Sequence, residues 1–226
     1  MGVQERRERE REQTRAKIMD AARELFARDG YDAVSMRKIA ETIEYSPTAI
    51  YVHFADKEAL FRDLCREDFR RLAGVFNELA LVKDPVERIL RIGHTYIRFA
   101  LEFPNHYRLM FMTPKAPPAD AEELERKGNP DEDAYAMLKL AVTGAIAGKR
   151  LRAEFKNADL AAQILWSVAH GVASLQITKG CDGWFDWQPI EARAAGALNS
   201  ILRGMLADPS QLPALGRKVG GKVVGK

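Results

Sequence analysis

Residues 35–54 read SMRKIAETIEYSPTAIYVHF, and this stretch decides the fold that we expect for the chain. It predicts two short helices, Met36 to Ile43 and Pro47 to Val52, each preceded by a serine whose hydroxyl can cap the first turn. The second helix opens on a proline, whose missing N–H removes no helical hydrogen bond at that position. Two short capped helices joined by a tight turn are typical of a helix-turn-helix.

The flanking sequence is helical as well, so the predicted fold class is all-α. Apolar residues recur at helical spacing, and no stretch alternates as a strand would. Upstream, the apolar face of Ile18 to Phe26 predicts a first helix that Gly30 ends. Downstream, a helix from about Lys57 to Leu81 joins this three-helix N-terminal domain to a C-terminal helical domain. About nine helices are expected, the others at 86–103, 105–112, 131–150, 159–179 and 189–207.

The bulk composition excludes several classes of protein. The N-terminus lacks the apolar core of a secretory signal, and no later run approaches the roughly 18 apolar residues of a membrane span, so we expect a cytoplasmic protein with no membrane contact. Cys65 and Cys181 are too far apart to suggest a zinc cluster. The four histidines, at 53, 94, 106 and 170, are scattered, and no serine or cysteine has a recognisable nucleophile setting. We therefore expect no enzymatic activity, no metal and no cofactor.

Bulk charge does not by itself predict a nucleic-acid partner. The net charge is +3, but residues 1–57 hold eleven Lys or Arg and eleven Asp or Glu. The local geometry of the helix-turn-helix is more informative, because its second helix can enter the major groove while its flanks meet phosphates. Thr48 and Ala49 lie in the first turn of that helix, where small side chains can touch base edges.

The remaining side chains around the motif are donors suited to phosphate oxygens. Tyr51 and His53 stand at the end of the second helix, and Lys57 stands at the start of the next helix, where backbone N–H groups already favour an anion. The candidate DNA-binding residues are Arg15, Ser35, Arg37, Lys38, Tyr45, Ser46, Thr48, Ala49, Tyr51, His53 and Lys57.

The order of these residues resembles the DNA-binding half of the tetracycline-repressor (TetR) family. The resemblance rests on Thr14-Arg15-Ala16-Lys17-Ile18, Ala21-Ala22-Arg23-Glu24-Leu25-Phe26, Gly30-Tyr31, Ser35-Met36-Arg37-Lys38-Ile39-Ala40, Ser46-Pro47-Thr48-Ala49-Ile50-Tyr51, His53-Phe54 and Lys57-Glu58-Ala59-Leu60. The family usually has Gly and then Val in the turn between the two helices, whereas this chain has Glu44 and Tyr45. The departure predicts a strained or shifted turn with an acid near phosphates.

A second resemblance lies in the C-terminal half. Trp166-Ser167-Val168-Ala169-His170-Gly171 is similar to the Trp-x-x-x-His-Gly signature of one TetR C-terminal subgroup, and residues 103–111 fit the same subgroup. The resemblance implies that the last two long helices form a four-helix dimer bundle. The small residues of the last helix independently favour close approach of a partner. The candidate interface residues are Leu165, Val168, Val172, Ala194, Ala197, Leu198, Ile201 and Met205.

Aromatic and methionine side chains of the C-terminal half are candidates for an effector cavity, which the resemblance implies. They are Tyr96, Phe99, Phe103, Met110, Phe111, Trp166 and His170. For each of them core packing is the competing interpretation, and for His170 a structural, hydrogen-bonded role is favoured.

The domain organisation that follows has four parts. Residues 1–13 form a charged N-terminal extension, 14–60 the helix-turn-helix domain, 61–207 the ligand-binding and dimerisation domain, and 208–226 a disordered tail. The Glu/Arg run at 5–12 is expected to be a solvated helical or frayed extension rather than a specific DNA arm. The Pro- and acid-rich stretch at 114–130 is expected to be a mobile loop.

The resemblance implies a homodimeric, sequence-specific DNA-binding transcriptional regulator. In that hypothesis the chain is a repressor that an unknown small-molecule effector releases from a palindromic double-stranded operator. The alternative is a small-molecule binding protein on the same scaffold, in which the Glu44 turn has weakened or abolished DNA binding.

Overall fold

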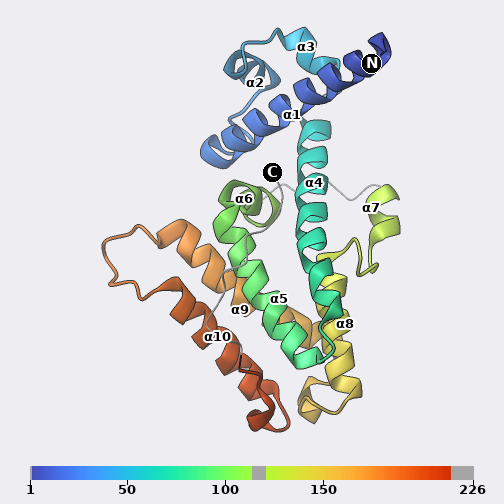
Figure 1. The fold of residues 1–226 in the computed structure, drawn as a ribbon. Coiled ribbons are helices and arrows are strands. Elements are labelled where there is room, and N and C mark those ends of the chain that lie inside the picture. The colour runs from blue at the N-terminus through green and yellow to red at the C-terminus, as the bar shows by residue number, and fades with distance from the viewer. Residues whose placement is uncertain (1, 114–120, 215–226) are drawn as a thin grey trace. The chain divides into compact units, whose positions relative to one another are not determined.

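The computed structural model of the chain describes residues 2–113 and 121–214, and all regular structure in these ranges is helical (Figure 1). The helices are α1 (Val3–Asp29), α2 (Met36–Thr42), α3 (Pro47–Tyr51), α4 (Lys57–Asn77), α5 (Pro85–Glu102), α6 (Pro104–Met112), α7 (Ala121–Arg126), α8 (Ala134–Ala147), α9 (Ala158–Lys179) and α10 (Ile190–Met205). Short 3-10 turns lie at Glu78–Leu81, Ala153–Phe155 and Pro209–Gln211. The described residues contain no strand, only an isolated antiparallel bridge between Leu151 and Leu206. The all-α prediction is confirmed.

The chain divides into two compact units. The first comprises the described residues of 1–68 and 105–121, and the second those of 69–104 and 122–226. Helix α4 begins in the first unit and ends in the second, so the division falls later than residue 60. Helix α6 also belongs to the first unit, because Leu109 is part of its hydrophobic core.

The core of the first unit holds α2 and α3 in place. Ile39 of α2 and Ile50 of α3 are completely buried, together with Ile18 and Ala22 of α1. The rings of Phe26, Tyr31 and Phe61 pack against one another with centroids 4.9–5.5 Å apart. Burying a full isoleucine or phenylalanine side chain stabilises the fold by about 1.5–3 kcal/mol, so these few contacts outweigh the weak helix propensity of such short segments.

The predicted helix ends are largely confirmed. The hydroxyls of Ser35 and Ser46 accept hydrogen bonds from the backbone N–H groups of Lys38 at 3.1 Å and Ala49 at 3.2 Å. Gly30 ends α1 with a φ of 83°, a conformation that favours glycine. Helices α2 and α3 each end one residue before the predicted position.

The charged N-terminal run is helical. Helix α1 begins at Val3, and residues 2–13 are all exposed, as expected for a solvated helical extension. Its i,i+4 pair of Arg6 and Glu10, with Nε and Oε1 2.9 Å apart, stabilises the first turns modestly.

The second unit is built from α5, α8, α9 and α10, which pack against one another. Leu198 of α10 lies so close to Gly93 of α5 that a Cβ built at residue 93 would stand 2.7 Å from the leucine Cδ2. Gly93 therefore lets these two helices approach. Among the described residues α9 is long and apolar enough to span a membrane by length and composition. The expectation that no run approaches this threshold was therefore wrong. Helix α9 packs against three other helices, but most of its apolar stretch is not buried within the chain.

Two other predictions need correction. Helix α7 lies within the stretch expected to be a mobile loop, and the rest of that prediction, at 114–120, falls outside the described residues. The tail expected to be disordered from residue 208 begins with an ordered turn, in which Asp208 accepts from the N–H of Ser210 at 3.0 Å. Residues 215–226 also lie outside the described part.

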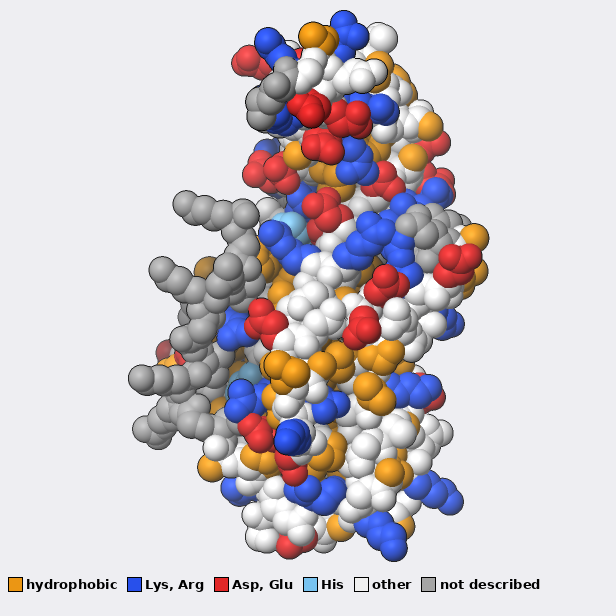
Figure 2. Space-filling model, turned by 45° about the vertical axis from the view of Figure 1, so that its right-hand side comes forward, with side chains coloured by type: hydrophobic (Ala, Val, Ile, Leu, Met, Phe, Trp, Pro, Cys, Tyr) orange, Lys and Arg blue, Asp and Glu red, His pale blue; other side chains and the backbone are white. Residues whose placement is uncertain are grey.

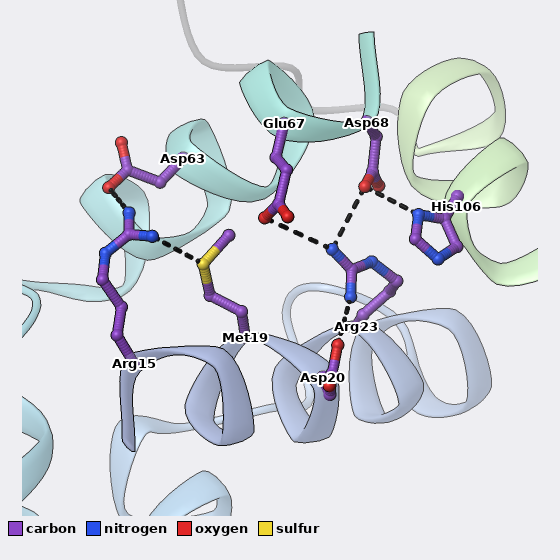
Figure 3. A network of polar contacts seen from close by, with 8 residues as sticks. All are labelled: Arg15, Met19, Asp20, Arg23, Asp63, Glu67, Asp68 and His106. Carbon is purple, nitrogen blue, oxygen red and sulfur yellow. Dashed lines mark hydrogen bonds and ion pairs between the residues drawn. The ribbon is translucent and has the colours of Figure 1, made fainter. Parts of the chain in front are cut away.

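A buried ion pair joins three helices of the first unit (Figure 3). Asp68 of α4 has a side chain only 1% exposed, and its Oδ1 lies 3.1 Å from Nη2 of Arg23 on α1. The same Oδ1 lies 2.7 Å from Nδ1 of His106 on α6. Asp20 holds the other side of the Arg23 guanidinium, with Nη1 and Oδ1 2.8 Å apart. The Asp68 carboxylate thus fixes α1 and α6 against α4.

Replacing Asp68 by alanine should lower the free energy of unfolding by about 3 kcal/mol, because Arg23 would lose its buried partner. Asp63→Ala is the matched control, since its pair with Arg15 is partly exposed and is expected to contribute less than about 1 kcal/mol. Urea denaturation measures both. Equal losses in the two variants would contradict the structural role assigned to Asp68.

Candidate DNA interface and effector site

The second helix of the motif presents polar side chains to solvent. Ser46, which caps α3, and Thr48 on α3 are exposed, Ala49 is partly exposed, and Tyr51 has 54% of its surface exposed. On α2, Arg37 is exposed and its Nε lies 2.9 Å from Oε1 of Glu41. These side chains are positioned by the capped starts of α2 and α3 and by the buried isoleucine that each helix contributes to the core.

Three predicted phosphate-binding cations are already engaged within the first unit. Arg15 donates to Oδ2 of Asp63 at 2.6 Å, and its guanidinium carbon lies 5.0 Å from the centre of the Phe54 ring. Lys38 donates to Oδ2 of Asp29 at 2.8 Å. Because these contacts are ionic, the two cations are partly neutralised before any DNA arrives.

Lys57, the third of these cations, binds backbone oxygens of its own chain. Its Nζ donates to the backbone oxygens of Tyr31 at 3.0 Å and Val34 at 2.9 Å, and lies 4.2 Å from the centre of the Tyr31 ring. Two carbonyls and a ring face thus satisfy the ammonium, which fastens the α1–α2 connection to the start of α4. The geometry favours a structural role for Lys57 over the phosphate contact expected from its position.

The turn between α2 and α3 is strained, as predicted. Glu44 has a φ of 60°, in the left-handed region that costs a residue with a Cβ roughly 1–2 kcal/mol. The turn persists because the next residue is anchored: the N–H of Tyr45 donates to the oxygen of Ala40 at 2.9 Å, and its ring packs partly buried on the core. Tyr45 therefore supports the motif from inside.

His53 lies at the end of α3 beside positive charge. Burial, and then the cations Arg11 and Arg15, lower the pKa of His53 below its usual 6.5. Its Nδ1 is buried and has no hydrogen-bond partner among the described residues. The imidazole is neutral near pH 7, so a phosphate contact by His53 would come from a neutral N–H rather than from a cation.

Acidic and basic side chains are interspersed on the face that Figure 2 shows, rather than gathered by sign. This agrees with the balanced charge of the first 57 residues. This face of the chain therefore carries no broad basic patch.

The structure brings together three of the predicted effector residues. Tyr96 Oη and His170 Nδ1 form a hydrogen bond at 3.0 Å between α5 and α9. The Trp166 ring packs edge-on to His170, with centroids 6.3 Å apart. His170 is therefore hydrogen-bonded, as its structural interpretation predicted.

The other four predicted effector residues are placed differently. Phe99 is 1% exposed and belongs to the core, and its ring centroid lies 5.3 Å from that of Phe103. Met110 and Phe111 lie in the first unit, on α6, where the Phe111 ring packs against Tyr107. Their side chains are not part of the Tyr96–His170–Trp166 group in the second unit.

Tyr135 of α8 was missed by the sequence reasoning. Its ring centroid lies 6.2 Å from that of Trp166, and its hydroxyl donates to Oδ1 of Asp159 at 3.1 Å. Lys139 also binds Asp159, with Nζ and Oδ2 2.8 Å apart, and this ion pair lowers the pKa of Asp159. No periodic signal in the sequence links α8 to the start of α9, so only the fold reveals this neighbour.

The predicted dimer residues divide into two groups. Four are buried within their own chain, so little of their side chains is left for a partner to contact: Leu165, Ala194, Leu198 and Met205. The others remain partly exposed on α9 and α10: Val168, Val172, Ala197 and Ile201. Close to them on α9, Leu160 and Leu175 are each 49% exposed. The resemblance pointed to α9 and α10 but could not tell which side of these helices the chain itself covers.

Changing Glu44 to glycine should raise the free energy of unfolding by about 1 kcal/mol, because glycine adopts a positive φ without steric cost. Glu44→Gln removes the same charge but keeps the Cβ, so its stability should stay within about 0.5 kcal/mol of the parent. Urea denaturation of both variants separates strain from charge. A glycine variant no more stable than the glutamine variant would contradict the strained turn.

The second unit should lose stability on acidification. Burial lowers the pKa of His170 and of His94 below 6.5. Below this value the unfolded chain binds protons that the folded chain does not, so the free energy of unfolding decreases as the pH is lowered. The loss begins near the unfolded value and levels off below the folded one. His170→Gln should flatten the dependence between about pH 7.5 and about pH 5.5, measured by urea denaturation. An unchanged dependence would exclude His170 as a source of it.

Comparison with known proteins agrees with this geometry. Residues 18–64 match the family model "Bacterial regulatory proteins, tetR family", and residues 89–199 match "Tetracyclin repressor-like, C-terminal domain". A solved TetR family transcription regulator from Marinobacter aquaeolei VT8 superposes with a TM-score of 0.69 at 20% identity, covering 88% of this chain and 98% of that one.

Two curated relatives match the N-terminal part alone. The HTH-type transcriptional repressor AcnR of Corynebacterium diphtheriae is 45% identical over 69 residues, which are 30% of this chain and 36% of AcnR. The HTH-type transcriptional regulator UidR of Escherichia coli K12 is 35% identical over 89 residues, 38% of this chain and 45% of UidR. The chain thus matches less than half the length of either relative. Because one TetR model matches the N-terminal part and another matches the C-terminal part, the chain belongs to the TetR family of bacterial regulatory proteins.

Proposed function

We propose that the chain is a homodimeric, sequence-specific DNA-binding transcriptional repressor that a small molecule releases from its operator. The observation that carries the proposal is the assembled helix-turn-helix, in which buried Ile39 and Ile50 hold α2 and α3 while Thr48 and Tyr51 face solvent. A rigid first helix behind an exposed second helix is the arrangement that enters a major groove.

In this proposal the DNA contacts come mainly from neutral donors. Thr48 and Ala49 meet base edges, where a hydroxyl and methyl groups discriminate weakly. Tyr51, Arg37 and the exposed serine caps contact phosphates and set the register of α3. Arg15, Lys38 and Lys57 act chiefly by holding the motif together, because their charges are already engaged.

The second copy of the chain is the partner that α9 and α10 fit. Exposed Leu160 and Leu175 and partly exposed Val168, Val172 and Ile201 would be covered by the same residues of a partner related by a twofold axis. Such a dimer presents two copies of α3 to a palindromic operator, whose half-sites lie about 34–36 Å apart. In the proposed soluble, cytoplasmic protein, burial in the dimer would also account for the apolar character of α9.

The effector is proposed to bind beside Tyr96, Trp166 and His170, where one hydrogen-bonded imidazole and two aromatic rings combine polar and apolar recognition. Binding there would change the distance between the two recognition helices. By thermodynamic linkage, operator DNA must weaken effector binding by the same factor as the effector weakens operator binding. No catalytic step is part of this function.

A second candidate function is a small-molecule binding protein on this scaffold with weak or lost DNA binding. Glu44 favours it, because its carboxylate lies exposed in the turn before α3, where it would repel phosphates.

Selection of genomic fragments by the full-length protein at low salt tests the proposal. We expect enrichment of one palindromic sequence, bound by a dimer, whereas the absence of any enrichment would establish the second candidate instead. Tyr51→Phe should then weaken binding of the recovered fragment without lowering the melting temperature. Lys57→Ala is the contrasting variant and should lower the melting temperature, since it removes the clamp on Tyr31 and Val34.

A further inference from the structure

The first three turns of α1 carry a stripe of arginines on one side. Arg7 and Arg11 are one turn apart, and Arg11 precedes Ile18 and Ala22 by seven and eleven residues, which returns it to nearly the same direction on a helix of 3.6 residues per turn. Ile18 and Ala22 are completely buried in the core of the first unit. Arg7 and Arg11 therefore lie on the same side of α1 as the residues that the helix buries within the domain.

Two of the four acids of the extension lie on a different side. Glu8 and Glu12 align by the same spacing with Met19, and Glu12 aligns with Arg23. Arg23 points toward α4, where it pairs with Asp68. The extension has no net charge, yet Glu8 and Glu12 lie toward the α4 side, away from the face that carries Arg7 and Arg11.

Pairing within the extension leaves two arginines available. Arg6 is bound to Glu10, and Arg9 also has an interaction within the chain. Arg7 and Arg11 make no hydrogen bond or ion pair with the described residues, and both are exposed. Their guanidinium groups are therefore free to bind an anion bidentately.

The stripe runs toward the end of the recognition helix. The next arginine along the stripe is Arg15, whose guanidinium group lies over the ring of Phe54. Phe54 follows Val52, the residue that caps the end of α3, by two positions. Arg11 is close enough to His53 that its positive charge helps to lower the pKa of that imidazole. Figure 1 shows α3 alongside the N-terminal part of α1 within the first unit.

We propose that Arg7 and Arg11 bind the DNA backbone at phosphates next to those met by the end of α3. This inference rests on the proposed function and adds a surface outside the helix-turn-helix. The partner is duplex phosphate rather than base edges, because a guanidinium on an exposed helix face reads charge and not sequence. The extension thus tightens binding to every DNA sequence alike, unlike a specific arm.

The salt dependence of operator binding tests the proposal, because each neutralised phosphate contributes about 0.9 to the slope of log K against log salt concentration. Binding of a labelled fragment recovered by the genomic selection is followed by fluorescence anisotropy at several salt concentrations. We expect Arg7→Ala and Arg11→Ala each to reduce the slope by up to about 0.9, and the double variant by about 1.8. Alanine preserves the helix, which circular dichroism verifies.

Arg6→Ala is the matched control, because it removes one charge from the same turns on the side opposite Arg15. It should leave the slope unchanged. A double variant with the parental slope, or an Arg6 variant that behaves like the Arg11 variant, would overturn the proposal while leaving the DNA-binding function intact. Failure of the parent protein to bind any fragment would overturn both.

Discussion

Two helices of seven and five residues cannot persist by themselves, so the molecule depends on the contacts that hold α2 and α3 against α1 and α4. Ile39 and Ile50 supply the apolar part of that attachment, each without any exposed surface. Lys57 supplies the polar part by binding two carbonyls of the α1–α2 connection. The presentation of α3 follows from this packing rather than from helix propensity.

The same constraint explains why the turn tolerates Glu44. The free-energy cost of the left-handed conformation at Glu44 is roughly equal to the stabilisation gained from burying one or two methylene groups. The residues on either side are fixed, Ala40 and Ser46 by backbone and cap hydrogen bonds and Tyr45 by partial burial. The fold therefore determines the turn conformation, and the local cost is carried by the core.

Local signals in the sequence predicted the all-α class, the capped starts of α2 and α3 and the end of α1 at Gly30, because each depends on residues within one or two turns. They failed where partners are distant. The pairing of Arg15 with Asp63 spans 48 residues, and Leu198 meets Gly93 across the second unit. Likewise, the resemblance placed Leu165 and Met205 at an interface, and only the fold shows that they are buried in their own chain.

These long-range contacts determine which cations stabilise the motif and which remain available to bind phosphate. A helix-turn-helix this small must fasten its connections with the same lysines and arginines that could otherwise meet phosphates, and Arg15, Lys38 and Lys57 are used in that way. Affinity for a polyanion must then come from donors that the packing leaves available. These are the hydroxyl of Tyr51, the exposed Arg37 and the exposed guanidinium groups that precede Arg15, so in our proposal much of the electrostatic contribution comes from the start of α1 rather than from α3.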